Sequence, residues 1–430
     1  MTARPEALTA AAAAAAIARK RLSAVDLVED CLVRSAADSS RAWVRLDAEG
    51  ARRAALARDK GMPIGPLHGV PIGIKDIIDT ADLPTECGSP TRAGHRPARN
   101  AVCVDRLLAA GAIVLGKTVT TEFAHLHPGP TANPHDPTRT PGGSSSGSAA
   151  AVAASMVPVA LGTQTGGSVI RPSSFCGVFG FKSTLGRTDV TGVAELARSF
   201  DTVGWFARDA ADLVLLAQVL LDAPCFVPGP VPARPRIGVT MTPAMASAMP
   251  EMRAAVESAV AKLAPAGYDV RPVELPADFA GLNPHHRITI ATEVGRALTR
   301  EWAEQRRLLS DKLRSFIETG LAAPDGSYER AQAAIAAARR DFDGLMSGWD
   351  ALLCPSAAGE APVGLDTTGD PVFNSMWSLL GAPCVSLPFA TGPNGLPVGI
   401  QLVGGRGRDE GLLALAEAIS QRLGIRVKHP

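Results

Sequence analysis

The sequence predicts an α/β fold in which short strands alternate with helices and some of the strands pair in parallel. Short apolar segments bounded by glycine and proline recur along the chain, and amphipathic or alanine-rich segments of helical length separate them. The 46% hydrophobic and 20% charged residues fall in the range of globular proteins. At 430 residues the chain can bury a large core, so one large domain or two domains are both consistent with its length.

Two helices are expected near the start of the chain. The alanine run over residues 10–16 favours a helix that continues to about Arg21. A signal peptide is not expected, because alanine is weakly apolar and three basic residues follow where a cleavage site should lie. Ser23 then has the character of an N-cap, with Asp26 three residues on, and opens a second helix that runs through Leu32.

A buried strand is predicted over residues 69–76, where apolar residues alternate with glycine and proline and the segment ends in Lys75 and Asp76. Lys75 is therefore expected at the end of a strand. Residues 102–110 predict an amphipathic helix, and residues 112–115 predict the next strand. This alternation of strand and helix favours parallel pairing in this part of the sheet.

Two glycine-rich loops form the most biased part of the sequence. Residues 141–148 read Pro-Gly-Gly-Ser-Ser-Ser-Gly-Ser and run directly into residues 149–154, which are strong helix formers. A strand over residues 157–161 follows, and then a second glycine-rich turn over residues 162–172. The sequence thus predicts two serine-bearing loops that are separated by only one helix and one strand.

The second half of the chain is expected to add a helical lobe and then complete the sheet. A proline-dense linker over residues 224–236 precedes helical, Ala/Arg-rich patterning that continues to residue 350. We expect residues from about 226 to 349 to form a variable helical lobe on the substrate side of a single domain spanning residues 1–430. Three apolar segments then restore the strand pattern: residues 352–354, 384–387 and 398–403.

Charge and composition exclude several classes of partner. The net charge of +1 supplies no basic stripe for a nucleic acid or an anionic membrane, and no apolar stretch reaches the ~18 residues that a membrane span needs. The 7 scattered cysteines include no CxxC pair, so we expect neither disulfides nor a zinc site, and a cytoplasmic location. We predict a small-molecule substrate, no cofactor and no metal, and leave homodimer formation open.

The second glycine-rich loop has the composition of an oxyanion-binding turn. Hydrolysis of an amide needs a positioned nucleophile, a base, a proton for the departing amine and donors for the oxyanion. Ser168 follows Gly166 and Gly167, and glycines there let successive backbone N–H groups turn toward one point. Residues Thr165 to Ser168 therefore suit an oxyanion hole, with the hydroxyl of Ser168 as the nucleophile.

Lys75 and Ser144 can supply the base. A lysine accepts a proton only when it is neutral, which requires burial to depress its pKa, and the apolar residues before Lys75 are compatible with burial. Ser144 would then pass the proton between Ser168 and Lys75. Taken alone, residues 142–148 would be a flexible linker and Lys75 a surface lysine. A linker is unusual between two apolar segments of one domain, and the second serine loop favours the catalytic interpretation.

Three motifs in this order resemble the amidase-signature family, and the resemblance runs over nearly the whole chain. Residues 69–76, 141–148 and 162–168 match that family's catalytic-lysine segment, its serine-rich loop and its nucleophile loop. The resemblance implies a central mixed β-sheet covered by helices on both faces. It also implies an amidase that hydrolyses a small carboxamide to a carboxylate and ammonia.

The same resemblance implies a role for each residue of the site. Lys75 would be the base, Ser168 the nucleophile that forms an acyl-enzyme, and Ser144 the bridging serine, preceded by a cis peptide bond. Ser145 would help to hold Lys75 in place without being one of the three catalytic residues.

Two positions depart from the commonest pattern of the family and narrow the substrate. Residue 164 is Gln where many members carry Asp, and Arg171 follows Ser168 by three residues where many members carry an arginine after two. This variant is similar to malonamidase, a branch in which that arginine holds the free carboxylate of the substrate. An acid-amide such as malonamate is therefore expected, because a guanidinium binds a carboxylate by two parallel hydrogen bonds. Arg171 could equally tie its loop to a buried acid.

Histidines and one cysteine are the remaining candidates. His125, His127 and His135 lie in a loop rich in Pro, Gly and Asn, where we expect surface histidines rather than metal ligands. Cys176 lies among apolar neighbours and is expected to be a small buried core residue rather than a nucleophile. In the helical lobe, the adjacent pair at residues 285–286 could face the substrate.

Two alternative functions stay open. The first is the glutamine-hydrolysing A subunit of an amidotransferase, which releases ammonia from glutamine for a partner enzyme and shares all three motifs. The second is a catalytically silent binding or scaffold protein of the same fold. The presence of Lys75, Ser144 and Ser168 counts against the second alternative.

Overall fold

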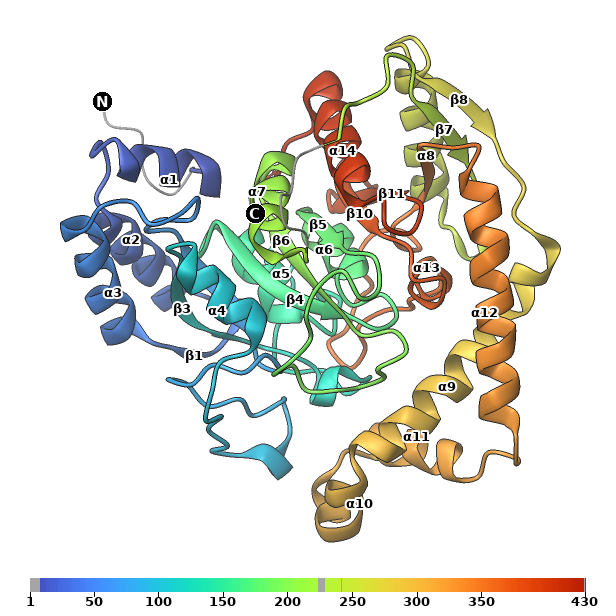
Figure 1. The fold of residues 1–430 in the computed structure, drawn as a ribbon, viewed down its shortest axis with the longest axis horizontal. Helices are drawn as coiled ribbons and strands as arrows, with labels where there is room; N and C mark the ends of the chain where they lie inside the picture. Colours follow the sequence, from blue (N-terminus) through green and yellow to red (C-terminus); the bar gives the residue numbers. More distant parts are fainter. Residues whose placement is uncertain (1–7, 223–228, 241, 429) are drawn as a thin grey trace.

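The computed structural model describes residues 8–222, 229–240, 242–428 and 430, which form an 11-stranded β-sheet with helices packed around it (Figure 1). The strand order is β1-β3-β2-β4-β6-β5-β10-β11-β9-β7-β8. The strands are β1 (Trp43–Leu46), β2 (Pro71–Lys75), β3 (Ile113–Thr118), β4 (Val159–Gln164), β5 (Phe179–Lys182), β6 (Thr202–Ala207), β7 (Arg236–Val239), β8 (Asp269–Pro272), β9 (Ala351–Pro355), β10 (Cys384–Thr391) and β11 (Pro397–Val403). The sheet is mixed, because β2 is parallel to β3 and β4 whereas β4 is antiparallel to β6.

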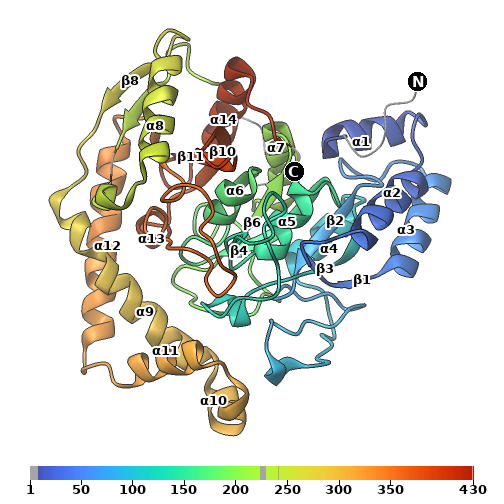
Figure 2. The ribbon, with the colours of Figure 1, turned by 180° about the vertical axis from the view of Figure 1, so that it is seen from behind.

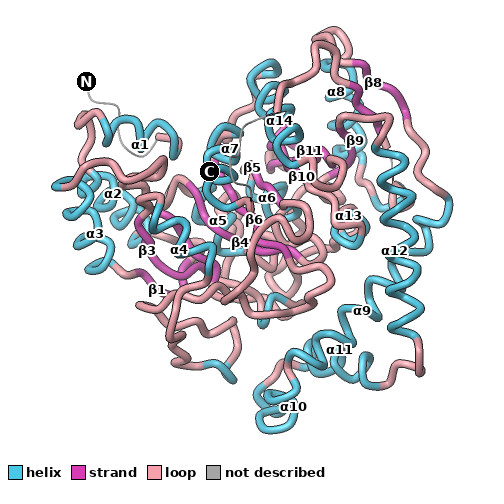
Figure 3. The backbone as a smooth tube through the Cα atoms, in the orientation of Figure 1, coloured by secondary structure: helices cyan, strands magenta, loops and turns pink. Residues whose placement is uncertain are grey.

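Helices cover both faces of this sheet, as the tube drawing in Figure 3 shows. Helices α5 and α6 pack against each other and the sheet, and α7, α8 and α14 form a second group on it. The helices are α1 (Ala10–Ala18), α2 (Ala24–Ala36), α3 (Ala48–Lys60), α4 (Val102–Ala109), α5 (Ser146–Ala153), α6 (Ile170–Cys176), α7 (Ala210–Leu220), α8 (Pro250–Leu263), α9 (Leu282–Ala297), α10 (Thr299–Gln305), α11 (Asp311–Leu321), α12 (Ser327–Met346), α13 (Ser375–Leu379) and α14 (Asp409–Leu423). The expected fold class, a mixed sheet covered by helices, is confirmed.

The first two helices form where the sequence predicts them. The hydroxyl of Ser23 caps α2 by accepting a hydrogen bond from the backbone N–H of Asp26 at 3.3 Å. The buried carboxylate of Asp212 accepts hydrogen bonds from the N–H groups of Ala10 and Ala11, at 2.8 and 2.9 Å. A negative group is favourable at a helix N-terminus, so Asp212 fixes α1 to the core.

The pairing of β2 with β4 brings the Lys75 segment and the second glycine-rich loop to the same edge of the sheet. The two strands are parallel, with Ile74 opposite Leu161, so their carboxyl ends lie side by side. Helix α5 connects the serine-rich loop to β4 and is buried at every residue. A Cβ on Gly147 would lie 2.2 Å from the carbonyl oxygen of Ala42, so only glycine permits this close packing. Small residues thus hold the serine-rich loop beside the end of β2.

A helical lobe made of α9 to α12 stands at one side of the sheet (Figures 1 and 2). An ion pair of 2.6 Å between Arg92 and Glu301 joins the lobe to the loop after β2. The backbone N–H of Ser310 donates to the buried carboxylate of Glu122 at 3.1 Å. These polar contacts dock the lobe against the end of the sheet where the candidate site lies.

The region predicted as a helical lobe, from about residue 226 to 349, is only partly helical. It also contains β7 and β8, which extend the sheet beyond β9. The Ala/Arg-rich pattern did not reveal β8, because its four residues are exposed or half-buried and show no apolar alternation. Of the proline-dense linker predicted over residues 224–236, residues 224–228 lie outside the described residues.

The described cysteines and helices bear on two further expectations. The cysteines within the described ranges are free and buried: Cys31, Cys87, Cys103, Cys176, Cys354 and Cys384. Burial raises the pKa of the Cys176 thiol, as expected of a core residue rather than a nucleophile. In the described part of the chain, no helix is long and apolar enough to cross a membrane.

Candidate active site

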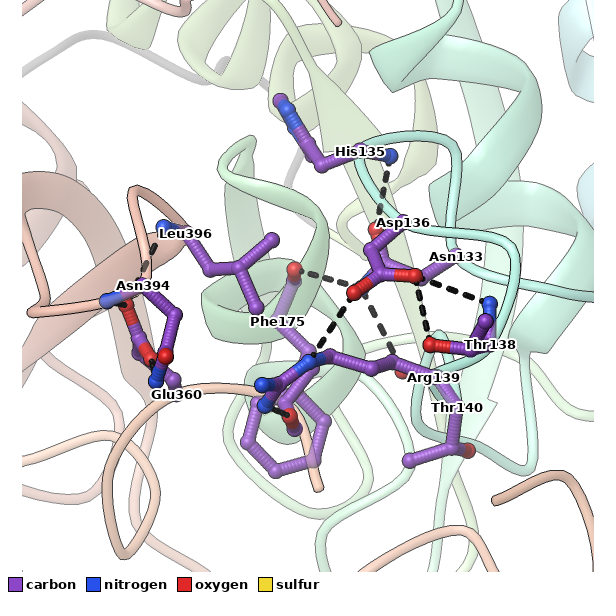
Figure 4. A network of polar contacts seen from close by, with 11 residues as sticks. Asn133, His135, Asp136, Thr138, Arg139, Thr140, Phe175, Glu360, Asn394 and Leu396 are labelled. Carbon is purple, nitrogen blue, oxygen red and sulfur yellow. Dashed lines mark hydrogen bonds and ion pairs between the residues drawn. The ribbon is translucent and has the colours of Figure 1, made fainter. Parts of the chain in front are cut away.

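The serine-rich loop begins from an anchored segment, residues 133–140 (Figure 4). The side-chain amide of Asn133 donates to the carbonyl oxygens of Thr140 and Phe175, at 3.2 and 2.9 Å. The guanidinium of Arg139 pairs with Asp136 at 3.1 Å and donates to the carbonyl of Ala361 at 2.6 Å. This network ties the start of the serine-rich loop to the end of α6 and to the loop after β9.

The loop then turns sharply into Ser144. Gly142 has a φ of +82°, and a Cβ there would lie 2.8 Å from Cα of Pro172, so no other residue fits. The peptide bond between Gly143 and Ser144 is cis, as the resemblance to the amidase-signature family implies. The carbonyl oxygen of Gly143 accepts a hydrogen bond from Arg171 at 2.7 Å.

Lys75 lies at the end of β2 with no exposed surface. Its Nζ is 2.7 Å from Oγ of Ser144 and 2.8 Å from Oγ1 of Thr163. Burial lowers the pKa of Lys75 to about 7, because removing the amine from water disfavours the ammonium form, and the charge of Asp201 opposes this effect only in part. A substantial fraction of Lys75 is therefore neutral near pH 7 and able to accept a proton.

Ser145 supports this arrangement through Thr163 and makes no direct hydrogen bond to Lys75. The Oγ of Ser145 donates to the carbonyl of Thr163 and accepts from the N–H of the same residue, both at 3.2 Å. Thr163 in turn presents its hydroxyl to Lys75. The sequence motifs pointed to Ser145 but gave no sign that Thr163 makes the second contact to the amine.

The second glycine-rich loop runs from the end of β4 to the start of α6 and carries Ser168. The carbonyl of Thr165 accepts a hydrogen bond from the ring Nε2 of His286 at 3.2 Å, and the carbonyl of Gly166 accepts one from Oγ of Ser378 at 2.6 Å. The carbonyl of Ser168 accepts from the N–H of Ser145 at 3.3 Å, which links the two serine loops. These carbonyl groups are therefore turned toward the surrounding protein.

The N–H groups of the same loop remain available. Within the described ranges, no protein group accepts a hydrogen bond from the backbone N–H of Gly166, Gly167 or Ser168. Across a trans peptide bond the carbonyl and the next N–H point in opposite directions, so the donors turn away from His286 and Ser378. Uncommitted N–H groups that turn toward one point are what stabilisation of an oxyanion requires.

A cavity of about 350 Å³ lies in front of this loop. The loop supplies Thr165, Gly166, Gly167 and Ser168 to its wall. The remaining lining residues come from distant segments of the chain: Ala124, His125, Leu126, Arg171, Leu196, Asn283, His286, Arg287, Ile290, Phe316, Asp370, Pro371, Val372 and Ser375. The volume suits a small molecule.

Arg171 is the cationic group buried in the wall of this cavity. Its side chain is 3% exposed, and one nitrogen, Nη2, donates to the carbonyl of Gly143 and to Oγ1 of Thr368. Its Nε and Nη1 have no hydrogen-bond partner among the described residues. Burial lowers the pKa of Arg171 to about 10, partly offset by the charge of Asp370, so it stays cationic at neutral pH.

The contacts of Arg171 bear on both roles considered for it. It holds the serine-rich loop through a backbone carbonyl, and within the described residues its Nε and Nη1 make no contact to a buried acid. The exposed carboxylate of Asp370 also lines the cavity. The cavity thus combines a buried cation that has unused donors with two exposed charged groups, the carboxylate of Asp370 and the guanidinium of Arg287.

The structure corrects the expectation for one loop histidine. His125 is buried rather than at the surface, lines the cavity and packs against Phe316 of α11 with ring centroids 4.3 Å apart. Burial lowers its pKa to about 4, so its ring is neutral. His127 is exposed as expected, and His135 is half-buried with Nε2 3.0 Å from the carbonyl of Cys176.

Of the two lobe histidines, only His286 lines the cavity. Burial lowers its pKa to about 4, so the neutral ring donates from Nε2 to the carbonyl of Thr165. Motif spacing could not reveal Phe316 or Ser378, because each comes from a segment far along the chain without a pattern of its own. Among the described residues, no group of three or more His, Cys, Asp or Glu side chains could hold a metal ion.

Comparison with known proteins gives consistent results. The model of the family described as Amidase matches residues 26–413. The chain is 36% identical to the A subunit of the glutamyl-tRNA(Gln) amidotransferase of Chloroflexus aurantiacus over 473 aligned positions, which cover 97% of this chain and 96% of the relative.

Solved structures of amidases are also similar to this chain. A crystal structure of an amidase has a TM-score of 0.90 and 32% identity, covering 97% of this chain and 100% of the other. The peptide amidase of Stenotrophomonas maltophilia has a TM-score of 0.83 and 28% identity, covering 98% of each chain. The chain belongs to the amidase-signature family and is an amide hydrolase that acts on carbon–nitrogen bonds.

Proposed function

We propose that this chain hydrolyses the terminal carboxamide of a small carboxylate-bearing substrate through an acyl-enzyme on Ser168. The observation that carries the proposal is the buried amine of Lys75, whose Nζ lies 2.7 Å from Oγ of Ser144. The neighbouring glycine-rich loop presents Ser168 to the cavity. A lysine whose pKa is lowered to about 7 can serve as a general base at neutral pH.

In this mechanism Ser168 Oγ attacks the carbonyl carbon of the amide while its proton passes to Ser144 and the proton of Ser144 passes to Nζ of Lys75. The negative charge on the carbonyl oxygen is stabilised by the free N–H groups of Gly166, Gly167 and Ser168, in the loop that begins at Thr165. Collapse of the tetrahedral intermediate breaks the C–N bond, and the proton returns through Ser144 to the departing ammonia. Water then hydrolyses the ester on Ser168 by the same steps and releases the acid.

Two charged groups of the cavity, Arg171 and Asp370, support an amino-acid amide as the substrate. The unused Nε and Nη1 of Arg171 suit a carboxylate, and the carboxylate of Asp370 on the same wall suits an ammonium group. Glutamine carries both groups and a terminal amide, whereas malonamate lacks the ammonium. The similarity to the A subunits of amidotransferases supports glutamine over malonamate as well. We therefore propose glutamine hydrolysis of the kind that supplies ammonia to a partner enzyme.

Ammonia release from three amides tests this proposal: glutamine, malonamate and the neutral propionamide, each at several concentrations. We expect the highest kcat/KM for glutamine and no release by Ser168→Ala. A preference for malonamate by the isolated chain would instead support the acid-amide hydrolase. A silent binding protein would release ammonia from none of them, and a fluorophosphonate would not modify its Ser168.

A further inference from the structure

Gln164 lies at the last position of β4, and its side-chain amide is fully buried. Its Oε1 accepts hydrogen bonds from the backbone N–H groups of Val169 and Ile170, at 2.8 and 3.0 Å. Its Nε2 donates to Oγ of Ser378 on α13 at 3.0 Å. The neutral side chain of Gln164 therefore accepts two hydrogen bonds through its oxygen and donates one through its nitrogen.

Ser378 continues this chain of hydrogen bonds into the nucleophile loop. Its hydroxyl has a single proton, which it donates to the carbonyl of Gly166 at 2.6 Å. It must therefore act as the acceptor toward Gln164. The direction of every hydrogen bond is thus fixed, from the amide N–H of Gln164 to Ser378 and from Ser378 to Gly166.

These contacts hold both flanks of Ser168. Gly166 precedes the nucleophile and is held through Ser378, while the two residues after Ser168 are held directly by the oxygen of Gln164. The intervening Gly166 and Gly167 have no side chains, and a Cβ on Gly167 would lie 2.7 Å from Oδ1 of Asn374. Asn374 and Pro371 pack closely against Gly167. Because glycine is conformationally permissive, the hydrogen bonds to the neighbouring residues restrict this segment further.

We propose that Gln164 and Ser378 are positioning residues that hold the N–H groups of residues 166–168 in the geometry that stabilises the oxyanion. This inference rests on the proposed function, because it takes Ser168 as the nucleophile. It also explains why a neutral amide occupies residue 164. A carboxylate could accept from the backbone N–H groups but could not donate to Ser378, which would then have to turn its only proton away from Gly166.

Two variants that break the chain test the proposal, Ser378→Ala and Gln164→Met, with Ser420→Ala as the control. Ser420 is equally buried and donates only within the C-terminal region, to the carbonyl of Ile425. A displacement of the oxyanion donors by about 1 Å costs roughly 10²-fold in rate. We therefore expect kcat on glutamine to fall about 10- to 100-fold with KM changed by less than about 2-fold. The second-order rate of modification by diisopropyl fluorophosphate should fall in parallel, because its phosphoryl oxygen occupies the oxyanion site.

The outcomes separate this proposal from the proposed function. If Ser168→Ala escapes modification while Ser378→Ala reacts like the wild type, the positioning role is wrong and the nucleophile stands. If Ser168→Ala is still modified at the same rate, the proposed function itself is wrong. A rise in KM at constant kcat for both variants would also overturn the positioning role, since it would report binding rather than the transition state.

Gln164→Glu gives a second test that does not depend on a large packing change. A protonated glutamic acid keeps one donor and one carbonyl oxygen, whereas the ionised form keeps no donor. We expect the ratio of the variant kcat to the wild-type kcat to fall at least 10-fold as the introduced carboxyl ionises with rising pH. A ratio that stays constant over the pH range in which the introduced carboxyl ionises would contradict the proposal.

Discussion

The amine of Lys75 shares a hydrogen bond of 2.7 Å with the hydroxyl of Ser144, in a site where the lysine has no exposed surface. The hydroxyl of Thr163 makes the second contact, at 2.8 Å. Neither contact supplies a negative charge that would stabilise an ammonium ion. Lys75 is therefore held in surroundings that favour its neutral form, and this is the physical basis of the predictions below.

The rate of amide hydrolysis should follow the titration of Lys75. Because burial lowers the pKa of Lys75 to about 7, the amine is protonated and unable to accept a proton at lower pH. We expect kcat/KM on glutamine to rise about 10-fold per pH unit up to about pH 7 and then to level off. A profile that falls with rising pH over this range would exclude a neutral lysine base.

The free energy of unfolding should also depend on Lys75. The pKa of this residue is about 7 in the folded protein and 10.5 in an unperturbed lysine, so between these values the unfolded chain binds more protons. The contribution of Lys75 to stability therefore rises with pH across this window, by up to about 1.4 kcal/mol per pH unit. Denaturant titrations of the wild type and Lys75→Met measure it as the difference between their slopes against pH. Equal slopes would mean that the lysine is charged in the folded protein.

Arg171→Ala should affect substrates in two separable ways. Loss of the hydrogen bond to Gly143 loosens the serine-rich loop and should slow every amide. Loss of Nε and Nη1, which have no protein partner among the described residues, removes the donors proposed to bind the substrate carboxylate. The value of kcat/KM for glutamine and malonamate should therefore fall by about 10-fold or more beyond the loss for propionamide. The three kcat/KM ratios measure this difference. Equal losses for all three amides would leave Arg171 with the loop-holding role alone.

Asp370→Asn should separate amino-acid amides from simple acid-amides. Asp370 is exposed at the cavity and carries the charge that suits a substrate ammonium group. We expect KM for glutamine to rise several-fold, because a partly solvated ion pair contributes about 1 kcal/mol, while KM for malonamate stays the same or falls. Steady-state kinetics on both substrates provide the measurement, and an equal rise in both would show that Asp370 does not recognise the ammonium.

The part of the site that the sequence predicted is the part built from consecutive segments. Lys75 ends β2, and the two serine loops flank α5 and β4, so the parallel pairing of β2 with β4 brings all three segments to one edge. Short-range patterns of apolar residues, glycine and serine were sufficient to locate these segments.

The rest of the site could not be predicted, because it depends on long-range packing. Phe316 and Ser375 reach the cavity from α11 and α13, and nothing in their local sequence marks them. His125 lies in a loop of surface-like composition, but Phe316 of the lobe covers its ring. Such contacts become visible only when the lobe is docked on the sheet.

A neutral Lys75 that activates Ser168 can be tested through the pH dependence of Ser168 modification by diisopropyl fluorophosphate. The rate is followed by intact mass, and the modified residue is identified by peptide mapping in the wild type and in Lys75→Met. We expect a single modification at Ser168, a rate that rises through about pH 7 in the wild type, and a rate about 10²-fold slower without this rise in Lys75→Met. Modification of a different residue, or a wild-type rate that does not change with pH, would contradict a lysine base at this site.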